Sequence, residues 1–233
     1  MKKTKNNKKS AQVGEGSNDC PICRAMKNGT ADNLEGLRKA FKEAEKRNSR
    51  MVMRSANKDD LYYDAMEMVL SGDYKTAEKL LIQAREIDPE YVQTYIGFVS
   101  VYSTSGKNEK ASQNIKIAFE KTQKLFPTWP RKLSWLDLEK RAYLRAIQYR
   151  ADLYVETGDK EKAIELYRLI LKFNPNDNQG VRYILAGLYA GKNGEEINDM
   201  FDYGNINQNW DKLEKMVEIQ NRKHVFWKQP RGL

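Results

Sequence analysis

The chain has 233 residues, of which 40 % are hydrophobic and 31 % charged, and its formal net charge is +9. The chain has only six prolines, which permits helix over most of its length. Its two cysteines are too few for a disulfide framework. No apolar run reaches 18 residues and no apolar stretch follows the basic N-terminus, so the sequence predicts no membrane span, no secretory signal and a cytoplasmic location.

The positive charge is unevenly distributed. Residues 1–58 contain 15 basic and 6 acidic residues, whereas residues 59–233 contain 26 of each. This distribution disfavours a basic face over a whole domain. We expect residues 1–33, rich in Lys, Asn, Gly and Ser, to be a disordered basic leader. Weak, salt-sensitive contact of residues 1–58 with RNA or a ribosome is an alternative role for this charge.

The leader contains the motif Cys20-Pro21-Ile22-Cys23. Two thiols in one turn are half of a tetrahedral zinc site, and the sequence has no other Cys and a single His, His224. Three readings remain open: an incidental turn, a zinc site completed by another chain or by His224 and a carboxylate, and a redox-active pair. The redox reading lacks the strands that usually accompany such a motif.

The first helical pattern follows the leader. Leu34, Leu37, Phe41 and Ala44 recur at intervals of three and four residues, which predicts a helix over about 34–52 within an N-terminal segment 34–57.

From about residue 58 the sequence repeats itself. Three segments share one pattern, in which an apolar helical face precedes a glycine and a second face begins five residues after it. The glycines are Gly72, Gly106 and Gly158, and the first two are 34 residues apart. Each segment therefore predicts two helices joined by a tight turn.

This pattern resembles the tetratricopeptide repeat (TPR). The residues that carry the resemblance are Gly72, Ala77, Ala84 and Pro89 in the first segment and Gly158, Ala163 and Pro175 in the third. The resemblance implies an all-α, right-handed α–α superhelix over residues 58–190, with three repeats and a partial fourth. The run 174–180 is similar to TPR proteins of bacteria without an assigned function.

The repeats also depart from the pattern. The second segment has no proline until Pro127, four residues late, so its second helix should be one turn longer than usual. The second and third glycines are 52 residues apart, which predicts an insertion over about 127–143. Pro127 and Pro130 should break the chain, and a helix of about 25 residues should follow over 132–156.

The C-terminal part should close the array. Residues 178–190 have the pattern of a first helix of a fourth repeat, and Gly191 and Gly194 then break the chain. Two further helices are expected near 195–203 and 209–223. We therefore interpret 191–233 as capping helices and a tail.

A TPR array implies a non-catalytic scaffold that binds a peptide or a helical partner in its groove. The groove-facing candidates on the first helices of the pairs are Tyr62, Met66, Gln93, Ser100, Arg145, Gln148, Arg182 and Tyr189. Trp129 and Trp135 should lie exposed at the base of the long helix and contact a partner. Tyr62 and Met66 stand where chaperone-binding TPR proteins have a carboxylate clamp, so chaperone tails are disfavoured.

Catalytic motifs are missing from the sequence. It has neither a His-based triad nor a glycine-rich phosphate loop, and its carboxylates alternate with Lys and Arg on helix faces. We therefore expect no enzyme, no cofactor beyond the zinc alternative, and no small-molecule substrate.

Overall fold

The computed structural model describes residues 35–36, 38–39, 42 and 57–230. The chain divides into two units, Met1–Ala56 and Asn57–Leu233. In the first unit the described residues are helical, in agreement with that part of the helix predicted over 34–52. The predicted leader 1–33, with Cys20 and Cys23, lies outside the described residues.

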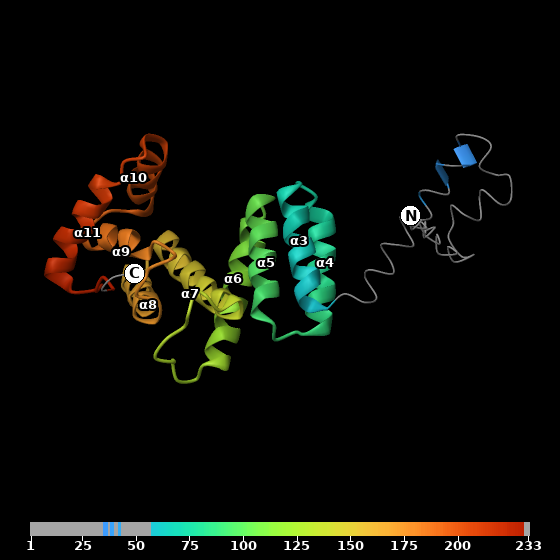
Figure 1. Ribbon diagram of the computed structural model, residues 1–233, viewed down its shortest axis with the longest axis horizontal. Coiled ribbons are helices and arrows are strands. Elements are labelled where there is room, and N and C mark those ends of the chain that lie inside the picture. The colour runs from blue at the N-terminus through green and yellow to red at the C-terminus, as the bar shows by residue number, and fades with distance from the viewer. Residues whose placement is uncertain (1–34, 37, 40–41, 43–56, 231–233) are drawn as a thin grey trace, which may run out of the picture. The chain divides into compact units, whose positions relative to one another are not determined.

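The second unit is built of α-helices throughout its described residues, without strands (Figure 1). None of them is long and apolar enough to cross a membrane. In chain order they are α3 (Lys58–Leu70), α4 (Tyr74–Ile87), α5 (Val92–Thr104), α6 (Asn108–Leu125), α7 (Leu138–Glu156), α8 (Lys160–Phe173), α9 (Val181–Tyr189), α10 (Gly194–Asn207) and α11 (Asp211–His224).

Consecutive helices pack as pairs, α3 with α4, α5 with α6 and α7 with α8. The first helices of the three pairs also pack against one another, α3 on α5 and α5 on α7. This arrangement is an α–α solenoid, and it confirms the predicted fold class.

One kind of turn joins the helices of each pair. At Gly158 the backbone has φ of 81°, a left-handed conformation that glycine adopts without strain. The Asp159 carboxylate then accepts a hydrogen bond from the Lys162 amide at 3.3 Å and caps α8. Asp73 caps α4 in the same way through the Thr76 amide at 3.0 Å.

The second helix of the middle pair is longer than its counterparts, as predicted from the late proline. Helix α6 has 18 residues, whereas α4 and α8 have 14 each. The difference of four residues is about one helical turn.

The long helix predicted over 132–156 is shorter in the structure. Helix α7 begins at Leu138 and has 19 residues. The preceding segment is held against the core, because Leu133 is buried and its amide donates to the Phe173 carbonyl at 3.3 Å. A side chain reinforces the non-helical course, since Arg141 Nε donates to the Trp135 carbonyl at 2.6 Å. Tertiary contacts thus override helix propensity here.

Two helices lie near the predicted positions 195–203 and 209–223, with two differences from the expected arrangement. Helix α9 packs mainly on α11, so α11 takes the place of a second repeat helix. Gly194 does not break the chain but is the first residue of α10, which Asn193 caps by accepting from the Glu196 amide at 2.9 Å.

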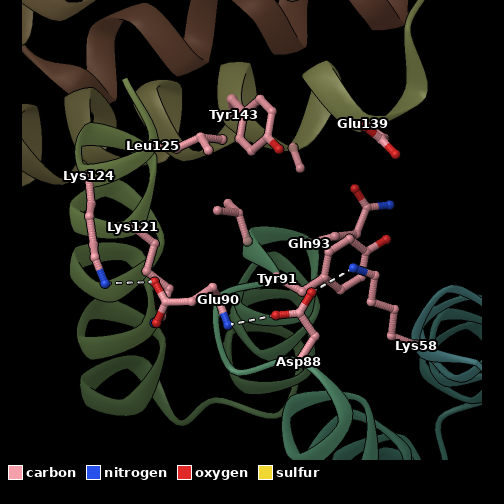
Figure 2. Close-up of a pocket in the computed structure, with 12 residues that line it drawn as sticks. Lys58, Asp88, Glu90, Tyr91, Gln93, Lys121, Lys124, Leu125, Glu139 and Tyr143 are labelled. Carbon is pink, nitrogen blue, oxygen red and sulfur yellow. Dashed lines mark hydrogen bonds and ion pairs between the residues drawn. The ribbon is translucent and has the colours of Figure 1, made fainter. Parts of the chain in front are cut away.

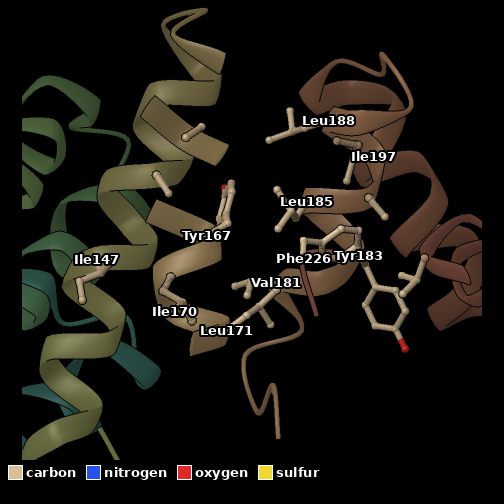
Figure 3. Packing of buried hydrophobic residues seen from close by; sticks show 14 of the residues in the cluster. Ile147, Tyr167, Ile170, Leu171, Val181, Tyr183, Leu185, Leu188, Ile197 and Phe226 are labelled. Carbon is tan, nitrogen blue, oxygen red and sulfur yellow. The ribbon is translucent and has the colours of Figure 1, made fainter. Parts of the chain in front are cut away.

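One group of packed apolar side chains runs from α7 to the C-terminal segment (Figure 3). Ile147 of α7, Tyr167 and Ile170 of α8, and Leu185 of α9 lie within it. Phe226 closes it from a segment far along the chain, packing near Tyr189 with ring centroids 5.5 Å apart. One continuous core therefore joins the third pair to the cap.

Candidate functional site

A pocket of about 420 Å³ opens along one edge of the array, the edge at which the first helices begin and the second helices end (Figure 2). Its walls come from the start of α3, the connection between α4 and α5, the end of α6 and the start of α7. We call it the base pocket. Because these segments belong to successive helix pairs, the stacking of the pairs creates it.

Charged side chains on one side of the base pocket form ion pairs with one another. Lys58 Nζ donates to Asp88 Oδ2 at 2.6 Å, and Lys121 Nζ donates to Glu90 Oε1 at 2.8 Å. Lys124 Nζ reaches the other oxygen of Glu90 at 3.3 Å. Each lysine that lines the pocket thus has a carboxylate partner.

The ion pairs alter the pKa values of their members. The hydrogen bond from Lys58 lowers the pKa of Asp88, and the same bond raises the pKa of Lys58 against the opposing effect of burial. Hydrogen bonds from Lys121 and Lys124 lower the pKa of Glu90. These shifts keep both carboxylates charged well below neutral pH, so the polar rim persists at physiological pH.

The opposite side of the base pocket is apolar. Leu125 and Tyr143 point into it there, across from the ion pairs (Figure 2). Leu125 is 53 % exposed although it is a large aliphatic side chain. The Tyr143 ring is held from behind by the edge of Phe126, with centroids 5.2 Å apart. The pocket therefore combines a polar rim of paired charges, on the side of Asp88 and Glu90, with an apolar corner formed by Leu125 and Tyr143.

Two of the predicted groove residues are buried rather than open to a ligand. Tyr62 is 5 % exposed and Gln93 is 6 % exposed. Burial raises the pKa of Tyr62, and the charge of Arg145 opposes this shift. Helix α5 packs against both α3 and α7. Val92–Val99 of α5 is buried along its whole length as a result. Among the eight predicted groove residues, Gln93 lines the base pocket.

Most of the other predicted groove residues already have partners within the chain. Arg145 lies over the Trp135 ring at 5.6 Å, and Gln148 accepts from Gln179 at 2.6 Å. Tyr189 stacks on His224 with centroids 3.9 Å apart. Met66 and Ser100 are partly buried, and Arg182 Nη1 donates to Asp177 Oδ2 at 2.9 Å.

The two tryptophans of the insertion are partly buried, contrary to the expectation of exposed rings. Trp129 packs on Phe173 at a centroid distance of 5.7 Å. Trp135 is covered by the guanidinium groups of Arg141 and Arg145 at 5.3 and 5.6 Å. The insertion therefore uses both indoles to attach itself to the array.

The pocket residues Lys58, Glu90 and Leu125 were missed by sequence reasoning. Glu90 and Leu125 stand beside the breaks at Pro89 and Pro127, and Lys58 begins α3, whereas the predicted groove residues lie within the first helices.

The zinc and RNA hypotheses stay predictions, because their residues lie in the first unit. Within the described part of the chain, no group of three His, Cys, Asp or Glu side chains could hold a metal ion.

The stacked helix pairs define an α–α repeat protein. Residues 144–177, which span the end of α7, α8 and the following turn, match the family model of the tetratricopeptide repeat. The match, together with the helical architecture, supports a TPR-type protein, and the TPR family generally serves as interaction scaffolds. Searches of curated proteins and of solved structures found no match to the chain.

Proposed function

We propose that this protein is a non-catalytic scaffold that binds a segment of another protein in the base pocket. The observation that carries the proposal is the exposed apolar corner of Leu125 and Tyr143 inside a pocket formed between successive repeats. Repeat arrays bind partners through surfaces built from several repeats, and this pocket is such a surface.

The chemistry of the pocket indicates the kind of segment that fits. An apolar side chain would leave water on contact with Leu125 and Tyr143, which provides the main favourable term. The three lysines are already paired with Asp88 and Glu90, and Glu139 also lines the pocket, so its three cationic and three anionic side chains balance. A segment with an apolar anchor and uncharged polar neighbours therefore suits it better than a strongly charged one.

The proposal is tested by affinity capture with a matched pair of variants. Leu125→Asp places a charge in the apolar corner, and Leu70→Asp makes the same change at the last residue of another helix, outside this pocket. Proteins bound to the wild type are identified by mass spectrometry and compared across both variants. We expect a partner that the Leu125 variant loses and the Leu70 variant keeps.

Two results would contradict the proposal. One is the absence of any protein above background on the wild type. The other is recovery of the same partners by both variants in the same amounts, which would place binding elsewhere. Circular dichroism of each variant shows whether the fold is retained, so a loss of folding is recognised before capture is compared.

A further inference from the structure

A second pocket, of about 560 Å³, lies where the insertion meets the end of α8 and the turn that follows it. Six of its lining residues carry the argument: Arg131, Lys132, Trp135, Leu136, Lys172 and Asn174. We call this the basic pocket, since three cationic side chains line it and no carboxylate does.

The three cations of the basic pocket have no partners in the described part of the chain. Arg131, Lys132 and Lys172 make no ion pair, side-chain hydrogen bond or ring contact there. This distinguishes the basic pocket from the base pocket, where lysines pair with Asp88 and Glu90. Since residues 59–233 are neutral in total, the basic pocket is a local excess of positive charge.

A buried amide adds a further unsatisfied donor. Asn174 lines the basic pocket and is only 5 % exposed, and its Nδ2 atom has no hydrogen-bond partner. Buried donors of this kind are normally satisfied. The unpaired cations and this amide together make the pocket rich in donors, which favours a ligand with several acceptor oxygens and negative charge.

The apolar part of the basic pocket favours a peptide over a nucleic acid. Leu136 is 85 % exposed beside Trp135, and an aliphatic side chain gives little to a nucleic-acid base. The Trp135 ring is already occupied by the guanidinium groups of Arg141 and Arg145, so a base could stack on it only by displacing them. An apolar side chain, in contrast, can pack on Leu136 and the ring edge without such a change.

We propose that the basic pocket binds an acidic segment of a partner protein. Carboxylates of the segment pair with Arg131, Lys132 and Lys172, and one apolar side chain packs on Leu136 and Trp135. The inference rests on the proposed scaffold function but uses a different surface from the base pocket, so the two can fail separately.

The test measures fluorescence anisotropy of labelled peptides with the full-length protein. The probes are (Glu-Glu-Leu)₄ and (Glu-Glu-Phe)₄, their counterparts with Gln in place of Glu, and a single-stranded oligouridine RNA. Two variants change the pocket: the triple reversal Arg131→Glu, Lys132→Glu and Lys172→Glu, and the single change Leu136→Ser.

Each variant has a matched control. Lys75→Glu, Lys79→Glu and Lys116→Glu reverse three exposed lysines elsewhere and change the net charge equally, which corrects for attraction to the basic residues 1–58. Leu70→Ser removes another exposed leucine outside the pocket. Melting curves establish that all four variants remain folded.

We expect the acidic peptides to bind more tightly than the Gln peptides, with affinity that falls as salt is added. The pocket reversal should weaken binding at least about tenfold and Leu136→Ser about threefold to tenfold, with little change in either control. Leu125→Asp should leave peptide binding unchanged, which separates this pocket from the base pocket.

Three outcomes would overturn the proposal. The acidic peptides could bind no better than the Gln peptides, the pocket reversal and its control could weaken binding equally, or the pocket reversal could affect only the RNA. The last result would assign the pocket to a nucleic acid.

Discussion

Asp152 is a carboxyl group placed between two helices of the third repeat. It lies on α7 and accepts a hydrogen bond from the Tyr167 hydroxyl of α8 at 2.5 Å. Burial raises the pKa of Asp152 to about 6, the Tyr167 hydrogen bond opposes this shift, and the charge of Glu156 adds to it. The folded protein therefore disfavours ionised Asp152 more than the unfolded chain does.

The sign of the pH dependence follows from this raised pKa. An unfolded aspartate has a pKa of about 3.9, so the folded protein holds the proton more tightly. The contribution of protonated Asp152 to the free energy of unfolding is fully present below about pH 4. It is lost as the pH rises through about 6.

Asp152→Asn should remove this loss, because the amide keeps an acceptor oxygen for Tyr167 and carries no charge. We expect the variant to exceed the wild type in free energy of unfolding by about 1–3 kcal/mol at pH 8 and to equal it near pH 4. Urea denaturation at both pH values measures the difference. The exposed Asp202→Asn serves as control, and an equal difference at both pH values would rule out the linkage.

Gly97 permits the closest approach between the first two helix pairs. A Cβ atom at this position would lie 2.6 Å from Leu81 Cδ2 and 3.3 Å from the Tyr62 ring. Both neighbours are buried, so the Leu81 side chain or the helices must shift to admit the extra methyl group.

Gly97→Ala should therefore destabilise the protein by about 1–3 kcal/mol, despite the better helix propensity of alanine. Gly194→Ala is the matched control, since its Cβ would meet only Val155 at an ordinary 3.4 Å. Thermal unfolding of both variants measures the effect. Equal stability of the two variants would mean that the helices adjust without cost.

At the scale of elements, α9 depends on a single carboxylate at its start. The Asp177 side chain is fully buried and accepts from the Val181 amide at 2.8 Å and from Arg182 Nη1 at 2.9 Å. Burial raises the pKa of Asp177, and its bonds to Arg182 oppose this shift. Arg182 also pairs with Glu214 of α11 at 3.1 Å, so this network connects the turn between α8 and α9 to α11.

Asp177→Ala should destabilise the protein by about 2–4 kcal/mol, because it removes the cap of α9 and leaves Arg182 without its buried partner. Asp177→Asn retains an acceptor for the amide and should cost less. Urea denaturation measures both, with Asp199→Ala on the surface of α10 as control. An effect of the alanine variant no larger than the control would show that the network contributes little.

The insertion shows where element-level reasoning from the sequence is limited. Its prolines predicted the break after α6, and the late proline predicted the extra turn of that helix. The start of α7 could not be predicted, because Lys132–Asp137 contains no residue that forbids helix and its course depends on the burial of Leu133 beside Phe173. Likewise, burial of Tyr62 and Gln93 depends on how closely α5 packs against α3 and α7.

At the scale of the whole molecule, the second unit contains its own continuous set of packed helices. The described helices from α3 to α11 contact one another in series and end on a cap. Because repeat arrays are stabilised by contacts between neighbours, this unit should not require the rest of the chain.

A fragment of residues 53–233 should therefore fold cooperatively with a melting temperature within about 3 °C of that of the full chain. Circular dichroism at 222 nm during heating measures both proteins. A fragment missing α11 as well, ending at residue 208, serves as a positive control and should melt lower because it exposes α9. A large loss on removing residues 1–52 alone would show that the first unit stabilises the array.

Local patterns along the chain predicted the helical repeat, its glycine turns, the longer α6 and the two helices that follow α9. Those features depend on local periodicity and on residues that permit or forbid a conformation, which are readable along the chain. The tertiary structure decided the two pockets, the burial of the expected groove residues and the start of α7. These depend on distances between side chains of different repeats, such as Leu125 and Tyr143, and a one-dimensional pattern does not contain such distances.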